Sequence, residues 1–356
     1  MRVLSGESDQ VVESKWHVSE RVVRLDASDA WKANLDEEFV SMMIFPNRQG
    51  ALPLVISMVM LWTTVVSAAD TVTHSFLGVG KANQAVIVDD SGKVVWKLAK
   101  PASDGWVLPN GNVLLALYST PGFPNGGAIE VDRQTKKTIF AYQGQQKETS
   151  TVQKLADGNY LVVELGPEPQ AVVVNPSGNV VRSTPLACQK KNFHMQTRML
   201  RVLPNGNYLA PHLLDFAVKE YDPANGKVLS MFPTDDRGRG KRDWPFTAIR
   251  LSNGNTLIAC TNGNRIIEVN AGGDIVWSVD NEDLGENLFD DACGAQRLPN
   301  GNTVISSYHA KGDAVKLFEV TRDKKVVWRY NGMNSGFHHF QILTTNGKPL
   351  EKNTLK

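Results

Sequence analysis

Short apolar segments alternate along the chain with one recurring polar turn, whose best-preserved form is L-P-N-G-N. In such a turn the Pro presets φ at its second position, the Asn tolerates the next position, and the Gly takes the positive φ that follows. Apolar residues flank each copy, as in WVLPNGNVLLALY and IRLSNGNTLIAC, so each turn is predicted to join two strands. The copies, about 47 residues apart, are at 108–112, 155–159, 203–207, 251–255, 298–302 and 343–347.

A second hairpin is predicted roughly 20 residues after each turn, as in AIEVDRQTKKTIFAY. Four strands per unit of this length are typical of a propeller blade. Five complete units, plus one blade assembled from an outer hairpin at 84–98 and an inner hairpin at 337–350, predict six blades. We therefore predict an all-β protein, a six-bladed β-propeller of four-stranded blades, closed by pairing of the N- and C-terminal strands. The Asn and Gly residues of the turns are then structural.

The N-terminal part of the chain has a different pattern. The apolar run at 51–66 is followed by SAAD, with small residues at the spacing that signal peptidase accepts. The run is shorter than the roughly 20 apolar residues of a membrane-spanning helix. We expect a signal peptide at 42–69, translation that starts at Met42 or Met43, and a non-native or disordered extension at 1–41. The alternative is a cytoplasmic tail ahead of a signal anchor.

These expectations place the propeller domain, residues 70–356, in the periplasm or the extracellular space, with membrane contact only if the signal segment is uncleaved. We expect a monomer. The formal net charge of +1 argues against a dedicated nucleic-acid binder, which would carry a strongly basic face. Export would permit disulfides. Because the cysteines form no close pair in the sequence, at most one bridge is expected among Cys188, Cys260 and Cys293.

The positions at which the blades differ are the candidates for function. Five residues before the Leu of each turn, near the start of the predicted innermost strand, the blades carry chemically different side chains. Equivalent positions ring the axis of a propeller, so these residues are expected to surround one mouth of the central channel. A purely structural ring is the alternative, because one fold hosts many functions. The six residues are Ser103, Ser150, Arg198, Phe246, Cys293 and His338.

Two charged loops are expected at the same mouth. The loop at 233–246 is basic and contains Trp244, whereas the loop at 280–292 is acidic. Mutual salt bridging on a solvated rim is the plainest interpretation, and such exposed pairs add little stability. The acidic loop also lacks the spacing of a calcium-binding loop, because Leu284 occupies the place of an oxygen ligand.

Two further histidines approach this mouth. His194 precedes Arg198 by four residues, and His339 directly follows His338. A metal site needs three or more ligands in a defined geometry, and the sequence does not specify such a set. No metal is therefore assigned.

The blade pattern resembles the bacterial PQQ-like repeat propellers, and it is similar to the six-bladed arylsulfotransferase-like propellers, whose blades often read H-D-x-Q-x-L-P-N-G-N. The segments HHFQILTTNG, CGAQRLPNGN and SDGWVLPNGN show parts of that pattern. The second resemblance implies that His338 attacks a sulfuryl group whose oxygens are bound by Arg198 and His194. The first implies a quinone, but the sequence lacks the Trp-docking signature and the neighbouring Cys pair of the eight-bladed quinoproteins. The cofactor is therefore left unassigned.

Three functions remain open from the sequence. The first is an exported propeller that binds a small molecule, a glycan or a protein at its channel mouth. The second is a transferase or hydrolase that acts on an anionic ester through His338, and the third is a PQQ-dependent oxidoreductase. Arg198 and His338 are expected to face each other across a solvated mouth that binds an anionic group. The candidate ligand-binding residues are Arg198, His194, Ser103, Ser150, Cys293, His339 and Trp244.

Overall fold

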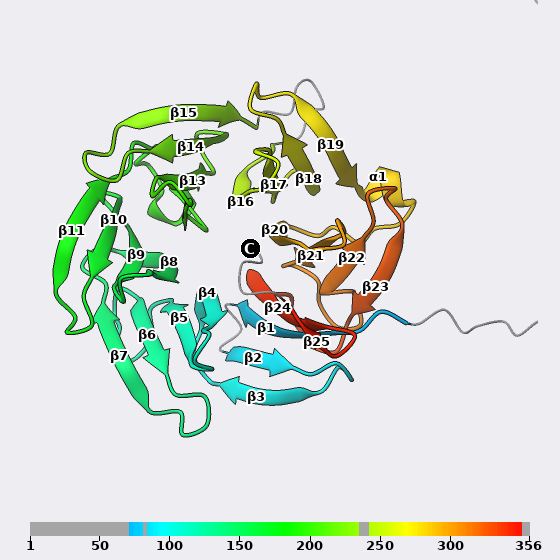
Figure 1. Ribbon diagram of the computed structural model, residues 1–356, viewed down its shortest axis with the longest axis horizontal. Helices are drawn as coiled ribbons and strands as arrows, with labels where there is room; N and C mark the ends of the chain where they lie inside the picture. The colour runs from blue at the N-terminus through cyan, green and yellow to red at the C-terminus, as the bar shows by residue number, and fades with distance from the viewer. Residues whose placement is uncertain (1–70, 81–83, 235–241, 351–356) are drawn as a thin grey trace, which may run out of the picture. The chain divides into compact units, whose positions relative to one another are not determined.

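The protein is a ring of six antiparallel sheets (Figure 1). The structure, a computed structural model, describes residues 71–80, 84–234 and 242–350. The expected extension at 1–41 and the expected signal peptide at 42–69 lie outside these residues. The predicted six-bladed propeller of four-stranded blades is confirmed.

Five blades each consist of four consecutive strands, ordered from the channel outward. The first has β4 (Ala102–Val107), β5 (Val113–Leu117), β6 (Gly127–Val131) and β7 (Thr138–Gln143). The second has β8 (Glu148–Lys154), β9 (Tyr160–Leu165), β10 (Gln170–Val174) and β11 (Val180–Pro185). The third has β12 (Arg201–Val202), β13 (Tyr208–His212), β14 (Ala217–Tyr221) and β15 (Val228–Pro233). The fourth has β16 (Pro245–Arg250), β17 (Thr256–Cys260), β18 (Arg265–Val269) and β19 (Ile275–Asp280). The fifth has β20 (Ala292–Arg297), β21 (Thr303–Ser307), β22 (Leu317–Val320) and β23 (Val326–Tyr330).

The sixth blade combines two distant parts of the chain. From the channel outward it contains β24 (His339–Thr345), β1 (His74–Gly80), β2 (Gln84–Val88) and β3 (Val94–Leu98). The two-stranded inner hairpin expected at 337–350 is wrong in one respect. β1 takes the second position by pairing with β24, whereas the return strand β25 (Lys348–Pro349) has only two residues and lies on the other side of β24.

The close packing of β1 explains why its sequence was not recognised as a strand. All seven of its residues are buried, and two of them are glycines, which give no alternating pattern. A Cβ atom at Gly78 would lie 2.5 Å from the ring of Phe337, so a larger residue would displace that ring. The glycine therefore permits β1 to pass directly beneath the segment that leads into β24.

The recurring turn has the backbone geometry that its sequence predicts. The glycines at its fourth position have φ values of 86 to 87° in the five complete blades. In four blades the following Asn donates its side-chain amide to a Glu on the third strand, as Asn112 does to Glu130 and Asn302 does to Glu319, both at 2.7 Å. These bonds fasten the turn to its own blade. The structural role predicted for the turn residues is therefore confirmed.

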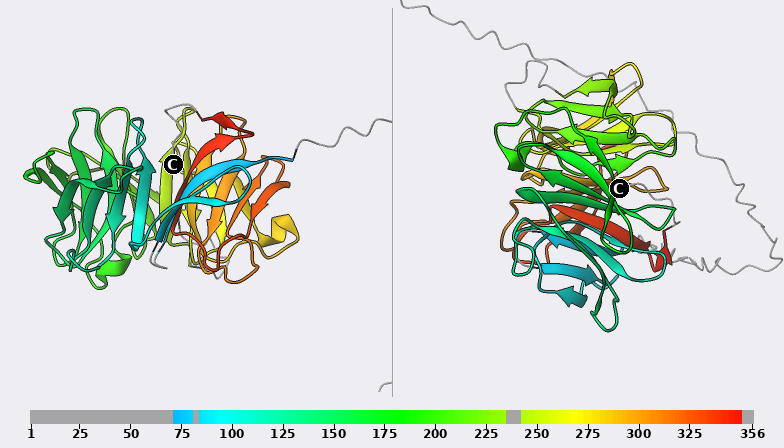
Figure 2. Two further views of the ribbon diagram at one scale, coloured as in Figure 1. Left: turned by 90° about the horizontal axis from the view of Figure 1, so that it is seen from below. Right: turned by 90° about the vertical axis from the view of Figure 1, so that its left-hand side faces the viewer.

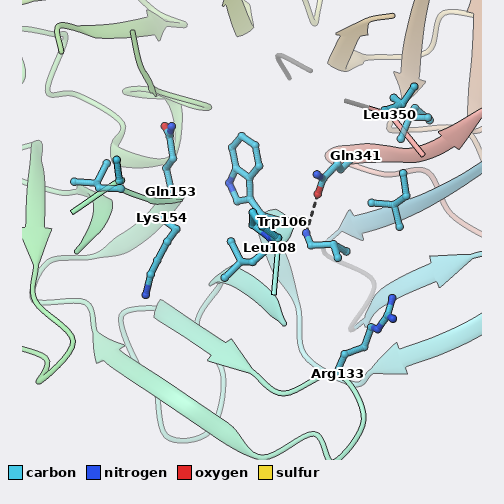
Figure 3. A pocket seen from close by; sticks show the side chains of 13 residues that line it. Trp106, Leu108, Arg133, Gln153, Lys154, Gln341 and Leu350 are labelled. Atoms are coloured by element: carbon cyan, nitrogen blue, oxygen red, sulfur yellow. Dashed lines mark hydrogen bonds between the residues drawn. The ribbon is translucent and has the colours of Figure 1, made fainter. Parts of the chain in front are cut away.

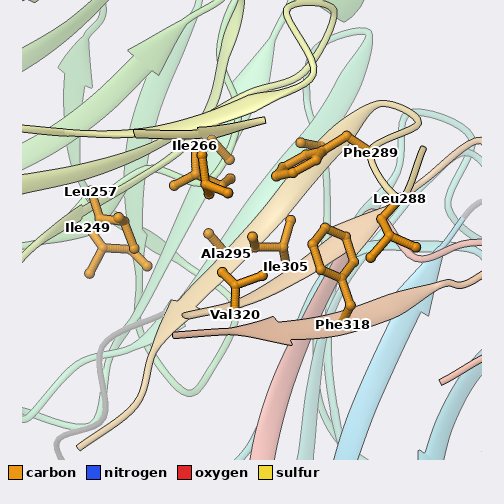
Figure 4. Close-up of a cluster of buried hydrophobic side chains, with 12 residues drawn as sticks. Ile249, Leu257, Ile266, Leu288, Phe289, Ala295, Ile305, Phe318 and Val320 are labelled. Atoms are coloured by element: carbon orange, nitrogen blue, oxygen red, sulfur yellow. The ribbon is translucent and has the colours of Figure 1, made fainter. Parts of the chain in front are cut away.

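The hydrophobic core lies between adjacent blades rather than at one central point. In the cluster drawn in Figure 4, Ile249 and Leu257 of the fourth blade pack against Ile305 and Phe318 of the fifth. Similar clusters fill the other interfaces between blades. Each blade therefore depends on its neighbours for burial of its apolar faces.

The innermost strands run from one face of the ring to the other (Figure 2). Residues at the start of these strands therefore lie at one end of the channel, and the L-P-N-G-N turns lie at the opposite end. No disulfide is seen among Cys188, Cys260 and Cys293. Among the residues that the structure describes, no helix is long and apolar enough to cross a membrane.

Candidate functional site

The six predicted ring residues do stand at equivalent places, at or just before the start of each innermost strand. The structure corrects one expectation about them: they are not solvated. Their exposed fractions range from 0 to 5%. Neighbouring blades make direct contacts here, since the Ser103 hydroxyl donates to the carbonyl of Ser150 at 2.8 Å and the Thr247 hydroxyl donates to the carbonyl of Cys293 at 2.7 Å. The ring residues are therefore packed within and between the blades rather than exposed to solvent.

Arg198 is occupied by an internal partner. Its Nη1 donates to Oε1 of Glu148 at 2.5 Å, and Nδ1 of His194 lies 2.8 Å from the other carboxylate oxygen. Burial acts to raise the pKa of Glu148, but the Arg198 charge and the bond from His194 outweigh it and hold that pKa below its usual value. Glu148 is therefore ionised at neutral pH and compensates Arg198. The expectation that a solvated Arg198 awaits an anion is wrong.

His338 is held within an aromatic stack. The Tyr308 ring lies parallel to it with centroids 3.7 Å apart, and the Phe246 ring is stacked with it at 5.7 Å. Burial raises the pKa of Tyr118 well above its ordinary value, so its hydroxyl keeps its proton at neutral pH. This hydroxyl forms a hydrogen bond with Nδ1 of His338 at 2.8 Å.

Phe246 links the two residues that were expected to face each other. The Arg198 guanidinium lies over the Phe246 ring at 6.0 Å, and that ring is also stacked with His338. Cys293 packs in the same small cluster. Burial raises the pKa of its thiol far above the ordinary value, so Cys293 is a neutral, weakly nucleophilic group at pH 7.

His339 is fully buried rather than exposed at the mouth. Its Nδ1 is 3.4 Å from Asp104, whose carboxylate accepts two bonds from Arg201, at 3.0 and 3.1 Å. The ion pair of Asp104 and Arg201 joins the innermost strands of the first and third blades. Sequence comparison of the blades did not single it out, although Asp104 occupies the D step of the H-D-x-Q pattern in SDGWVLPNGN.

Partly exposed residues lie over this buried ring. Trp244 and Tyr308 pack against the cluster that contains Phe246 and Cys293. His309 is adjacent to Tyr308 and pairs with Asp291 at 2.9 Å. Sequence reasoning missed Tyr308, because it compared the blades only at the start of the innermost strand, whereas Tyr308, like Tyr118 of the first blade, directly follows the second strand. This end of the channel thus offers two aromatic rings and hydrogen-bonding groups next to the buried ring.

The charged loops form separate ion pairs. The acidic loop contains the short helix α1 (Asn281–Leu284), and its Asp283 pairs with Lys324 at 2.7 Å, whereas Glu286 pairs with Arg329 at 2.5 Å. Both partners belong to the fifth blade. Mutual pairing with the basic loop is therefore not seen for these two acids, and residues 235–241 of that loop lie outside the described ranges. No group of three potential metal ligands occurs among the described residues.

Comparison with known proteins supports the fold, but it does not assign a family or a function. No family model matches the chain, and no curated protein matches it. Among solved structures, a protein of unknown function from Bacteroides caccae is 23% identical, with a TM-score of 0.65 over 75% of this chain and 98% of that one. A catalytically inactive virginiamycin B lyase from Staphylococcus aureus, solved with quinupristin, is 11% identical, with a TM-score of 0.51 over 77% of this chain and 93% of that one. The chain is thus a six-bladed β-propeller, and the PQQ-like and arylsulfotransferase-like resemblances stay predictions.

Proposed function

We propose that the protein is an exported propeller that binds a small neutral ligand with ring faces, such as a sugar unit of a glycan, at the Tyr308 end of its channel. The observation that carries this proposal is the position of Tyr308. Its ring rests at 3.7 Å on the buried His338 ring, so it is fixed from below while part of it stays exposed. An aromatic ring held in this way is a preformed platform for a flat ligand face.

The polar surroundings favour a neutral ligand over an anion. Arg198 is buried and compensated by Glu148, so it does not offer a free cation. Among the described residues at this end, the polar groups near the surface include His194, whose side chain is 42% exposed, and the pair of His309 and Asp291. Such groups donate and accept hydrogen bonds, as hydroxyl-rich ligands require.

Binding is preferred to catalysis because of how His338 is held. An arylsulfotransferase-like mechanism needs an unprotonated imidazole nitrogen directed at the substrate. Here Nδ1 is already engaged in a hydrogen bond with the Tyr118 hydroxyl at 2.8 Å. The ring is also enclosed by Tyr308 and Phe246. This setting suits a supporting role, and the enzymatic alternative is kept as an outcome of the test below.

The ligand proposal predicts the effect of removing the platform. Tyr308→Ala and Trp244→Ala are each expected to weaken binding of a neutral sugar by about tenfold, on the order of 1 kcal/mol for a lost stacking contact. Binding is measured by calorimetry against a panel of neutral mono- and disaccharides. Ile139→Ala is the matched control, because it removes an exposed apolar side chain, 56% exposed, from the outer strand β7.

Two results would count against this proposal. One is a panel in which no sugar gives saturable binding to the unaltered protein. The other is equal loss of affinity in Ile139→Ala and Tyr308→Ala. The enzymatic alternative is examined with His338→Gln: loss of turnover of a sulfate ester, with the fold retained, would support it, whereas no turnover in the unaltered protein would not.

The export part of the proposal rests on the apolar run at 51–66 and the small residues after it. We expect N-terminal sequencing of the mature protein to begin at Ala69 or Asp70. A mature chain that still begins at Met1 would contradict both cleavage and the late translation start. A chain that begins at Met42 or Met43 would favour a retained anchor.

A further inference from the structure

A second candidate site lies at the opposite end of the channel from Tyr308, and it goes beyond the proposed function. A groove of about 700 Å³ opens there, at the ends of β4, β8 and β24 and beside the turns that follow them. Its apolar walls include Leu108, Leu155, Leu343 and Leu350, and its polar lining includes Arg133, Gln153, Lys154 and Gln341. In Figure 3, Trp106 lies between Gln153 and Lys154 on one side and Gln341 and Arg133 on the other.

Trp106 is what makes this part of the channel different from the rest. Two residues before the Leu of the turn, three blades carry Gln, at positions 153, 296 and 341, whereas the first blade carries Trp106. Its indole Nε1 donates to the carbonyl of Val152 at 2.7 Å, and the guanidinium of Arg201 lies 4.9 Å from its ring. The indole is therefore fixed as an apolar surface of the groove, in a place where the repeat has an amide.

The two glutamines of the groove are oriented by the backbone. Oε1 of Gln341 accepts the N–H of Val107 at 2.7 Å, and Oε1 of Gln153 accepts the N–H of Val202 at 3.1 Å. Since a backbone N–H requires an acceptor, these bonds assign the oxygen and the nitrogen of each amide. The remaining hydrogen-bonding capacity of each group is mainly its NH2, which is a donor.

The charge of the groove has one sign. Arg133 and Lys154 are both in its lining, and no Asp or Glu is among the described residues that line it. Lys154 is partly compensated from behind, because its ammonium lies 3.4 Å from the nearly buried carboxylate of Glu130 and over the Tyr160 ring. The polar side chains of the groove thus present donors and positive charge.

We propose that this groove binds an organic anion, a single carboxylate or other oxyanion group attached to a flat apolar body. The apolar body lies against Trp106 and the surrounding leucines. The anionic group is held by one of the two cations, Arg133 or Lys154, with an amide NH2 group, and the other cation adds to the positive potential of the groove. Guanidinium and ammonium groups bind oxyanions through charge-assisted hydrogen bonds, which are stronger than neutral ones. A neutral analogue of the same shape leaves these donors without a charged acceptor.

The test uses 2-naphthoate as the probe and 2-naphthamide as its neutral counterpart, with calorimetry at low ionic strength. The unaltered protein is expected to bind one naphthoate, at least ten times more tightly than the amide, with affinity that falls as salt is raised. Arg133→Gln and Lys154→Gln should each weaken naphthoate binding about five- to tenfold. Lys137→Gln is the matched control, because this exposed residue lies in the same β6–β7 turn as Arg133 but outside the groove.

Further variants locate the bound probe. Trp106→Gln introduces the residue type of three other blades and should abolish naphthoate binding, whereas Tyr308→Ala should leave it unchanged. Thermal unfolding of each variant identifies any loss of fold. Arg133 lies on an exposed turn, so Arg133→Gln is expected to fold normally and to report on binding alone. Equal affinity for naphthoate and naphthamide, unchanged affinity in both cation variants, or absence of saturable naphthoate binding at millimolar concentration would overturn the proposal.

Discussion

Replacing Asp104 by Ala is expected to lower the free energy of unfolding by about 3 to 5 kcal/mol, the usual effect of breaking a buried ion pair. Arg201 would lose both bonds to the carboxylate, at 3.0 and 3.1 Å, while it remains almost completely buried. An uncompensated guanidinium inside the channel is more unfavourable than the loss of the pair as a whole. Urea unfolding at pH 7 measures the change.

Two comparisons separate this effect from a general loss of packing. The double variant Asp104→Ala/Arg201→Met removes both charges and is expected to recover a substantial part of the lost stability. Asp283→Ala breaks the partly exposed pair with Lys324 and is expected to change stability by about 1 kcal/mol or less. If Asp104→Ala lowers stability no more than Asp283→Ala, then the channel pair is not the strong constraint inferred here.

Stability is also expected to fall in mild acid because of His212. This ring is fully buried, with Nε2 2.7 Å from the Tyr221 hydroxyl and Nδ1 3.1 Å from the carbonyl of Gln196. Burial, and next the charge of Lys219, lower the pKa of His212 to about 4 from its ordinary value of 6.5. Between pH 4 and 6.5, His212 is protonated in the unfolded chain but neutral in the folded protein. The free energy of unfolding therefore rises with pH in this range.

The stabilising contribution is therefore present above about pH 6.5 and is lost as the pH falls towards 4. Its size is at most about 1.4 kcal/mol per pH unit, or roughly 3 kcal/mol over the window. His212→Gln cannot titrate, so its unfolding free energy should depend less steeply on pH between 7 and 4.5. Parallel pH profiles for the variant and the unaltered protein would show that another group is responsible.

The sequence allowed the fold to be predicted because the repeat carries its signal in local backbone chemistry. A Gly at φ near 86° is required in every complete turn, so the same letters recur wherever two inner strands meet. The prediction failed where the signal is not local. β1 was missed because the reason for a glycine at position 78 is its close contact with the Phe337 ring, and Phe337 is far away in the sequence.

The sequence predicted where the candidate site residues lie along the channel, but not their burial or their partners. Counting back from each turn found residues that lie at one end of the channel, but it did not show that they are buried. The sequence suggested that Arg198 is an available cation, because its partner Glu148 lies 50 residues away on another blade. Tyr308 and Trp106 were missed because the blades were compared at a single step of the innermost strand, and both residues lie at other steps of the repeat.

The pairing of β1 with β24 also bears on how the chain acquires its structure. His74 and Thr344, which meet in this pair, are 270 residues apart. During synthesis β1 has its inner neighbour only after almost all of the propeller has been made, and until then one of its edges stays open. Closing so long a segment carries a large entropic barrier and slows the final step. We expect a nascent chain in this state to depend on chaperones that shield unpaired strand edges. Aggregation is most favoured just before the last inner strand docks.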